Sequence, residues 1–165
     1  MQINWTLVTG LAAFSLAAAA SWDAGSAARQ HRLPWRVLAV VHLVLLAELL
    51  GGNRFGAIDA IDAALPGIDR PAVRIGLALL MALATGGVAI MIARVVRRIP
   101  LFAPAALATL AAAALFGVET LSVGAVGALL YRPVGPVMLI GWLWLGCGLT
   151  VVATAIVTVK SIRTR

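Results

Sequence analysis

The sequence predicts an all-α membrane protein, a five-transmembrane-helix bundle with short interfacial amphipathic segments on the outer side. Of its 165 residues, 62% are hydrophobic and only 12% are charged, whereas a soluble domain carries about 25% charged residues. The charges are also grouped, and residues 3–22, 101–118 and 137–159 contain none. A helix needs about 20 apolar residues to cross a hydrocarbon core, so these segments predict transmembrane spans.

We expect a single integral membrane domain over residues 1–165, with helices because their backbone polar groups are satisfied internally in lipid. Pro34 suits the first turn of the second helix, where its missing N–H is harmless, and Pro100 and Pro104 precede and enter the fourth. The apolar runs are too even for the alternating strands of a barrel. The predicted spans are residues 3–21, 34–52, 72–93, 101–118 and 137–159.

The first span has an alternative interpretation as a cleaved signal peptide. The small residues 17–20 resemble a cleavage site, but residues 1–6 lack the Lys or Arg that such a peptide carries at its start. An uncleaved helix is therefore preferred.

Two connections are predicted to lie on the outer side. Residues 53–66 predict an interfacial helix, with Ile58 and Ile61 at helical spacing and Asp59 and Asp62 on another side. Residues 119–135 are almost uncharged and predict an interfacial or re-entrant segment. Each connection contains or precedes an Arg-Pro pair before the next span, which suggests duplication of a helix pair. Chance similarity between sequences rich in Ala, Leu and Gly is the alternative.

The distribution of basic residues predicts the orientation. Cytoplasmic loops carry an excess of Lys and Arg, which places the N-terminus outside and the C-terminus in the cytoplasm of a bacterial inner (plasma) membrane. The side with more basic residues holds Arg29, Arg32, Arg36, Arg94, Arg97, Arg98, Lys160, Arg163 and Arg165, and the other holds Arg54, Arg70, Arg74 and Arg132. Arginine also outnumbers lysine, which is typical of a GC-rich bacterial genome.

Three ionisable residues fall within or at the ends of the spans: His42, Glu48 and Glu119. Intramembrane ionisable groups are costly and suggest function, although a neutral histidine bonded to a neighbouring helix needs no function. His42 and Glu48 are six residues apart, so they lie about 120° apart around a helix and do not form a metal site by themselves. The candidate ion-pair partners on the outer side are Arg54, Arg74 and Arg132.

Small residues recur in the spans and let helices approach closely, within a bundle or between subunits. The single cysteine excludes an intrachain disulfide and a multi-cysteine metal site. No nucleotide-binding or metalloprotease motif is present, so no metal or cofactor is predicted, and bound lipid is expected. The candidate packing residues are Ala82, Gly86, Ala113, Gly117, Gly141 and Gly148.

These features favour an accessory or scaffold subunit of a larger bacterial membrane complex of a respiratory, photosynthetic or transport kind. The expected partners are the lipid bilayer and other membrane-protein subunits, or further copies of this chain, and not nucleic acid. The alternative is a small homo-oligomeric transporter or channel for a cation, a proton or a small solute that uses His42, Glu48 and Glu119. A redox or metal-dependent enzyme is less favoured because histidines are scarce.

Overall fold

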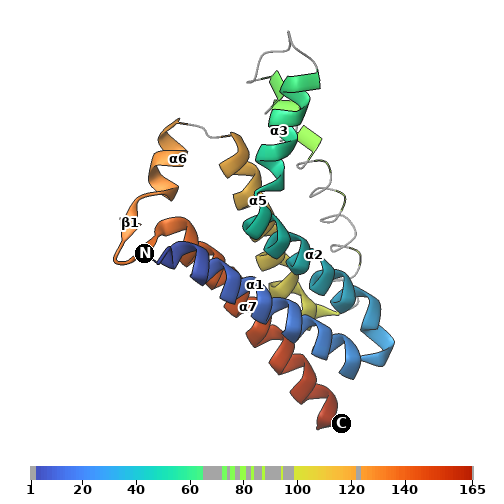
Figure 1. Ribbon diagram of the computed structural model, residues 1–165. Helices are drawn as coiled ribbons and strands as arrows, with labels where there is room; N and C mark the ends of the chain where they lie inside the picture. Colours follow the sequence, from blue (N-terminus) through green and yellow to red (C-terminus); the bar gives the residue numbers. More distant parts are fainter. Residues whose placement is uncertain are drawn as a thin grey trace.

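The computed structural model describes residues 3–64, 72–73, 75–76, 79–80, 83, 87, 94, 99–121 and 124–164. Within these residues, four helices are long and apolar enough to cross a membrane, so the protein is a polytopic helical membrane protein. The predicted span 72–93, with Ala82 and Gly86, lies largely outside the described residues. The four helices are α1 (Trp5–Ala27), α2 (Arg32–Gly51), α5 (Ala103–Leu121) and α7 (Leu139–Arg163) (Figure 1).

Helix α1 extends beyond the predicted span, which ends at residue 21. It begins after Asn4, whose side-chain oxygen accepts a hydrogen bond from the Leu7 backbone N–H at 3.1 Å, as an N-cap residue does. It ends at Ala27, where the Ala28 N–H bonds to the Ala24 carbonyl. The predicted span covers only the apolar residues that hydrocarbon requires. Outside the hydrocarbon a helix can continue through polar residues, because its backbone hydrogen bonds still form. For the same reason α7 continues to Arg163, beyond residue 159.

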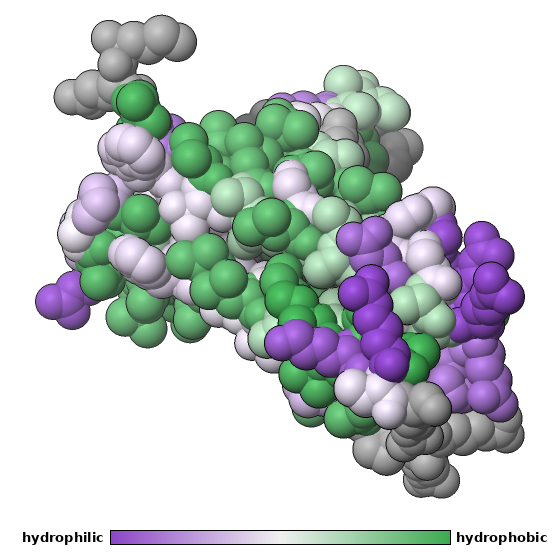
Figure 2. All heavy atoms as spheres, turned by 90° about the horizontal axis from the view of Figure 1, so that it is seen from below, coloured by the Kyte–Doolittle hydropathy of each residue, from purple (hydrophilic) through white to green (hydrophobic). Residues whose placement is uncertain are grey.

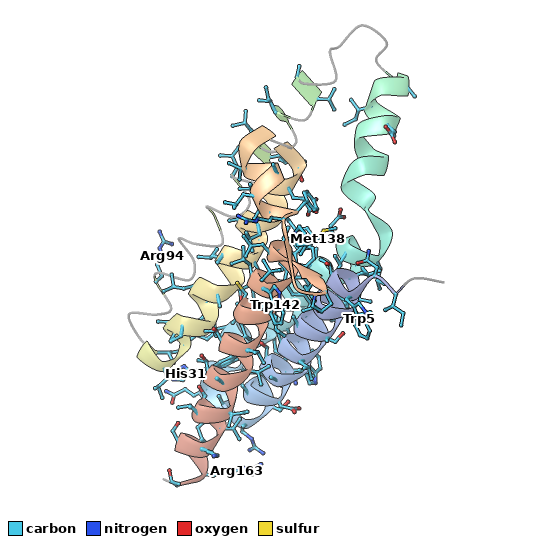
Figure 3. All side chains as sticks on the ribbon, turned by 90° about the vertical axis from the view of Figure 1, so that its left-hand side faces the viewer. Trp5, His31, Arg94, Met138, Trp142 and Arg163 are labelled. Atoms are coloured by element: carbon cyan, nitrogen blue, oxygen red, sulfur yellow. The ribbon has the colours of Figure 1, made fainter. Side chains whose placement is uncertain are left out.

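Helix α1 packs between α2 and α7, and α7 also packs against α5. The short 3-10 turn Arg29–His31 joins α1 to α2, so these two helices are antiparallel. Helices α1 and α7 are parallel: Figure 3 places Trp5 and Met138 towards one end of the pair and His31 and Arg163 towards the other. We call the end with Trp5 and Met138 the hairpin end, after the β-hairpin described below. The end with His31 and Arg163 is the turn end.

The core near the turn end is built around an edge-to-face pair of aromatic rings. Trp35 of α2 and Phe102, in the 3-10 turn Pro100–Phe102, have ring centroids 5.1 Å apart at an interplanar angle of 88°. This contact places the start of α5 beside the start of α2. The buried residues of this core are Ala17, Ala24, Ala28, Trp35, Leu38, Phe102, Ala105, Ala106, Val151 and Ala155.

A second core lies nearer the hairpin end, where Phe14, Phe116 and Trp144 form an aromatic cluster. The Phe116 and Trp144 rings stack with centroids 5.4 Å apart, and the Phe14 ring lies 5.8 Å from that of Phe116. These three rings come from α1, α5 and α7, so they join the middle of α1 to the last turns of α5 and the first turns of α7. The buried residues of this core are Phe14, Leu45, Ala112, Phe116, Leu130, Ile140 and Trp144.

Helix α3 (Asn53–Ala64) follows α2 almost directly and covers most of residues 53–66, for which an outer interfacial helix was predicted. Gly52 separates the two helices. It adopts a left-handed conformation with φ of 56°, and its N–H bonds to the Glu48 carbonyl. Glycine adopts this conformation without the steric cost of a side chain, so α2 ends here and the chain changes direction before α3.

The predicted segment 119–135 contains the end of α5, a short helix and the first strand of a hairpin. Helix α5 continues to Leu121, the short helix α6 (Gly124–Leu130) follows, and strands β1 (Pro133–Val134) and β2 (Val137–Met138) form a hairpin. Gly135, at the first position of the two-residue loop, has φ of 68°, which a type II′ turn requires. The hairpin leads directly into α7.

The surface of the helices that faces away from the bundle interior is strongly apolar. Leu33, Val44 and Leu107 are 75%, 61% and 64% exposed. Such a surface favours contact with lipid hydrocarbon over water. Figure 2 shows hydrophobic side chains over much of one face, with the hydrophilic ones gathered to one side. The spans therefore imply a lipid bilayer as the surroundings of the chain.

Candidate functional site

His42 lies in the interior of the bundle on α2. Its side chain is fully buried, with its ring 6.2 Å from that of Phe14. The Nδ1 atom is 2.8 Å from the Leu38 carbonyl oxygen. A carbonyl only accepts hydrogen bonds, so Nδ1 carries the proton and donates. In the neutral ring, Nε2 is then a lone-pair acceptor.

The Nε2 atom of His42 is buried and has no hydrogen-bond partner among the described residues, and the same holds for the Nε1–H of Trp144. Both rings pack against Phe14, with centroid distances to its ring of 6.2 Å for His42 and 6.0 Å for Trp144. An unsatisfied acceptor and an unsatisfied donor thus flank one phenyl ring. Unsatisfied buried polar atoms cost about 1–3 kcal/mol each, so these two atoms mark a costly polar point in the described core.

The two glutamates lie away from this point, towards the hairpin end. Both are half-buried, and Glu48 is on the last turns of α2. Glu119, near the end of α5, accepts a hydrogen bond from the Tyr131 hydroxyl. Tyr131 is a partner that the sequence analysis missed, because only the turn after α6 brings it back over α5. Among the residues that the structure describes, no group of three His, Cys, Asp or Glu residues is positioned to hold a metal ion.

The predicted arginine partners are only partly described. Arg74 and the side chain of Arg54 lie outside the described part of the chain. The Arg132 side chain is exposed, and its carbonyl accepts a hydrogen bond from the Leu139 N–H at 3.0 Å. The backbone of Arg132 therefore helps to fix the start of α7.

The predicted packing residues occupy different environments. A Cβ atom at Gly148 would lie 2.8 Å from the Ala13 carbonyl oxygen, so α1 and α7 pack closely there. A Cβ at Gly141 would meet Val137 at 2.7 Å and Thr6 at 3.1 Å, whereas one at Gly117 would meet nothing within 4 Å. Ala113 is half-buried on α5.

A basic cluster at the turn end contains contacts that the sequence analysis did not predict. The Arg36 guanidinium lies 3.1 Å from the centroid of the Trp22 ring, a cation–π contact. Its Nη2 donates a hydrogen bond to the Ser26 hydroxyl at 3.1 Å. Arg36 lines a pocket of about 430 Å³ with Ser26, Arg29 and Arg32. In the sequence these arginines indicated only the orientation of the chain.

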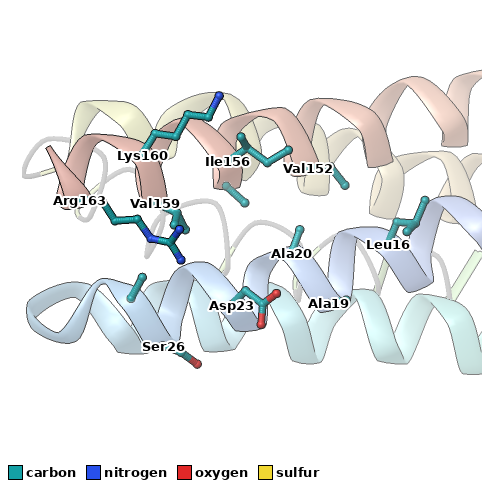
Figure 4. Close-up of a pocket in the computed structure, with 12 residues that line it drawn as sticks. Leu16, Ala19, Ala20, Asp23, Ser26, Val152, Ile156, Val159, Lys160 and Arg163 are labelled. Carbon is teal, nitrogen blue, oxygen red and sulfur yellow. The ribbon is translucent and has the colours of Figure 1, made fainter.

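A groove of about 820 Å³ runs between α1 and α7 (Figure 4). Leu16 and Ile156, which line it, are 55% and 49% exposed, so the groove opens on the outer surface. Its walls are mostly apolar, and Asp23, Lys160 and Arg163 lie towards the turn end. The Arg163 side chain extends from α7 towards α1 in this view (Figure 4).

No protein-family model, no curated protein and no solved structure matches this chain. The fold and the arrangement of its polar groups therefore carry the functional argument.

Proposed function

We propose that the chain crosses a bacterial inner membrane five times, with its N-terminus outside and its C-terminus in the cytoplasm. Helix α2 ends at the hairpin end and α5 begins at the turn end, so residues 52–99 connect opposite ends of the bundle. A segment that connects opposite ends of the bundle supports an odd number of membrane crossings between α2 and α5. The described residues within 53–98, among them Val73 and Leu79, are helical. The excess of arginine at the turn end supports a cytoplasmic location for that end.

We further propose that the protein is an accessory or scaffold subunit of a larger membrane assembly. The observation that carries this proposal is the groove between α1 and α7. Small residues, among them Ala19 and Ala20, line one wall, and small residues allow a neighbouring transmembrane helix to approach closely. The opposite charges of Asp23 and Lys160 at its turn end suit a helix with polar residues at its own end.

Site-specific crosslinking tests this proposal. A photoreactive residue replaces Ala19 in the groove, and the control replaces Val44 of α2, which is 61% exposed on another helix. We expect Ala19 to give a discrete adduct whose mass identifies another subunit or a second copy, whereas Val44 gives lipid adducts only. The substitution Ala19→Trp, which fills the groove, should release the partner during purification in mild detergent.

Recovery of the native chain solely as a monodisperse monomer, with no protein adduct from Ala19, would contradict the subunit proposal.

The second candidate function is transport of a proton, a cation or a small solute by a homo-oligomer. The unpartnered Nε2 of His42 favours it, because unsatisfied polar atoms deep in a transmembrane bundle accompany proton relays and substrate paths. Flux in proteoliposomes tests it with the variants His42→Ala, Glu48→Ala and Glu119→Ala. Unchanged flux in all three would exclude this function.

A further inference from the structure

We propose that the pocket at the turn end binds the phosphate headgroup of an anionic phospholipid. Three arginines and one serine line it, Ser26, Arg29, Arg32 and Arg36, with a volume of about 430 Å³. None of the described residues that line the pocket is acidic. In the sequence, residues 24–47 contain no Asp or Glu. A cluster of cations without a neutralising carboxylate attracts a phosphate by charge.

The Arg36 guanidinium is already oriented for such a ligand. Its plane is held over the Trp22 ring at 3.1 Å, and Nη2 is fixed by Ser26. Its Nε is buried and has no hydrogen-bond partner among the described residues. A guanidinium stacked on an aromatic ring keeps its N–H donors in one plane, which matches two oxygens of a phosphate. Preorganised donors bind at a lower entropic cost.

The close approach of α1 and α2 creates this geometry. A Cβ at Gly25 would lie 3.2 Å from the Trp35 Cβ and 3.3 Å from the Arg32 carbonyl oxygen. The absence of a side chain at Gly25 therefore brings the last turn of α1 against the first turns of α2. Ser26, the next residue, then meets Arg36 across the helix pair.

The location of the pocket favours a lipid headgroup over a free anion. It lies where α1 ends and α2 begins, at one end of two transmembrane helices, and lipid phosphates occupy that depth of a bilayer. Trp22 is 50% exposed and Leu33 is 75% exposed, which gives an aromatic residue and an apolar residue for the region next to the headgroups. Since three cations face the pocket, the lipid is anionic rather than zwitterionic.

The test compares two variants that each remove two positive charges from the same end of the bundle. Arg29→Gln/Arg32→Gln alters the pocket, and Lys160→Gln/Arg163→Gln is the control at the groove. Native mass spectrometry in detergent measures binding of added phosphatidylglycerol. We expect binding at least about tenfold weaker for the pocket variant, because the loss of even one charge-assisted contact weakens binding by about that factor, and unchanged binding for the control. Arg36→Lys, which keeps the charge but not the planar donors, should also bind less.

Three outcomes would overturn the proposal. Equal losses in the two double variants would indicate general electrostatic attraction, and equal binding of phosphatidylcholine by the native chain would remove the selectivity for anionic lipid. Displacement of phosphatidylglycerol by excess inorganic phosphate would indicate a site for a free anion. Circular dichroism identifies variants that do not fold, and the single variant Arg36→Lys then supplies the comparison.

Discussion

Two glycines on α7, two residues apart, should respond in opposite directions to the same substitution. At Gly148 an added Cβ would lie 2.8 Å from the Ala13 carbonyl oxygen and 2.9 Å from the Ala13 Cβ. At Gly146 an added Cβ would meet nothing within 4 Å. The two alanine variants therefore separate the effect of helix packing on stability from the effect of helix propensity, within one turn of one helix.

The expected magnitudes follow from these contacts. In Gly148→Ala the helices α1 and α7 must separate until the 2.8 Å contact reaches the 3.4 Å of ordinary van der Waals contact. The Ala13 carbonyl is backbone and cannot rotate away, so we expect a loss of about 1–3 kcal/mol, which is typical of overpacking. In Gly146→Ala the better helix propensity of alanine should stabilise the protein by about 0.5–1 kcal/mol.

The free energy of unfolding can be measured by titration of the detergent-solubilised protein with SDS, followed by circular dichroism. Gly148→Ala should unfold at lower SDS than the native chain, and Gly146→Ala at equal or higher SDS. If the two variants have the same stability, or if Gly148→Ala is the more stable, the close approach of α1 and α7 is wrong.

Substitutions at three further residues test individual contacts. Thr6→Val removes the hydroxyl that accepts the Met138 N–H at 2.9 Å, so hydrogen exchange at that amide should accelerate while the rest of α7 stays protected. Tyr131→Phe removes the hydroxyl that donates to Glu119, and should lower the free energy of unfolding by at most about 1 kcal/mol. His42→Ala leaves a cavity in place of a fully buried ring and should cost about 2–5 kcal/mol in an SDS titration, whereas His42→Phe, which keeps a ring, should cost less.

The sequence predicted the helical class and the four described spans because long uncharged runs have few alternatives in lipid. Helices α1 and α7 continue beyond the predicted spans 3–21 and 137–159. Hydropathy measures the apolar run, while Asp23 and Ser26 continue the helix of α1 into the polar region. The hairpin before α7 was also missed, because its strands have only two residues each, too few for an alternating pattern.

The candidate site was only partly predictable. The cost of an ionisable group in hydrocarbon identified His42 as a notable residue, but its contact with Phe14 depends on how α1 packs against α2. The contact between Arg36 and Trp22 joins two helices across the turn. A signal was available in the sequence, since an arginine cluster follows an aromatic residue at a span end, but charge counting assigned those residues to orientation alone. The Tyr131 and Glu119 pair depends on the path of α6.

The account depends most directly on the two ends of the chain lying on opposite sides of a membrane. Cys147 is the only cysteine, so Cys147→Ala allows a single new cysteine at Asn4 or at Thr164, each labelled in intact cells without an outer membrane by a membrane-impermeant maleimide. We expect the maleimide to label the cysteine at position 4 in intact cells, because this end of the chain lies outside. The cysteine at position 164 should be labelled only after lysis, because that end lies in the cytoplasm. Labelling of both positions before lysis, or of neither, would contradict an odd number of membrane crossings.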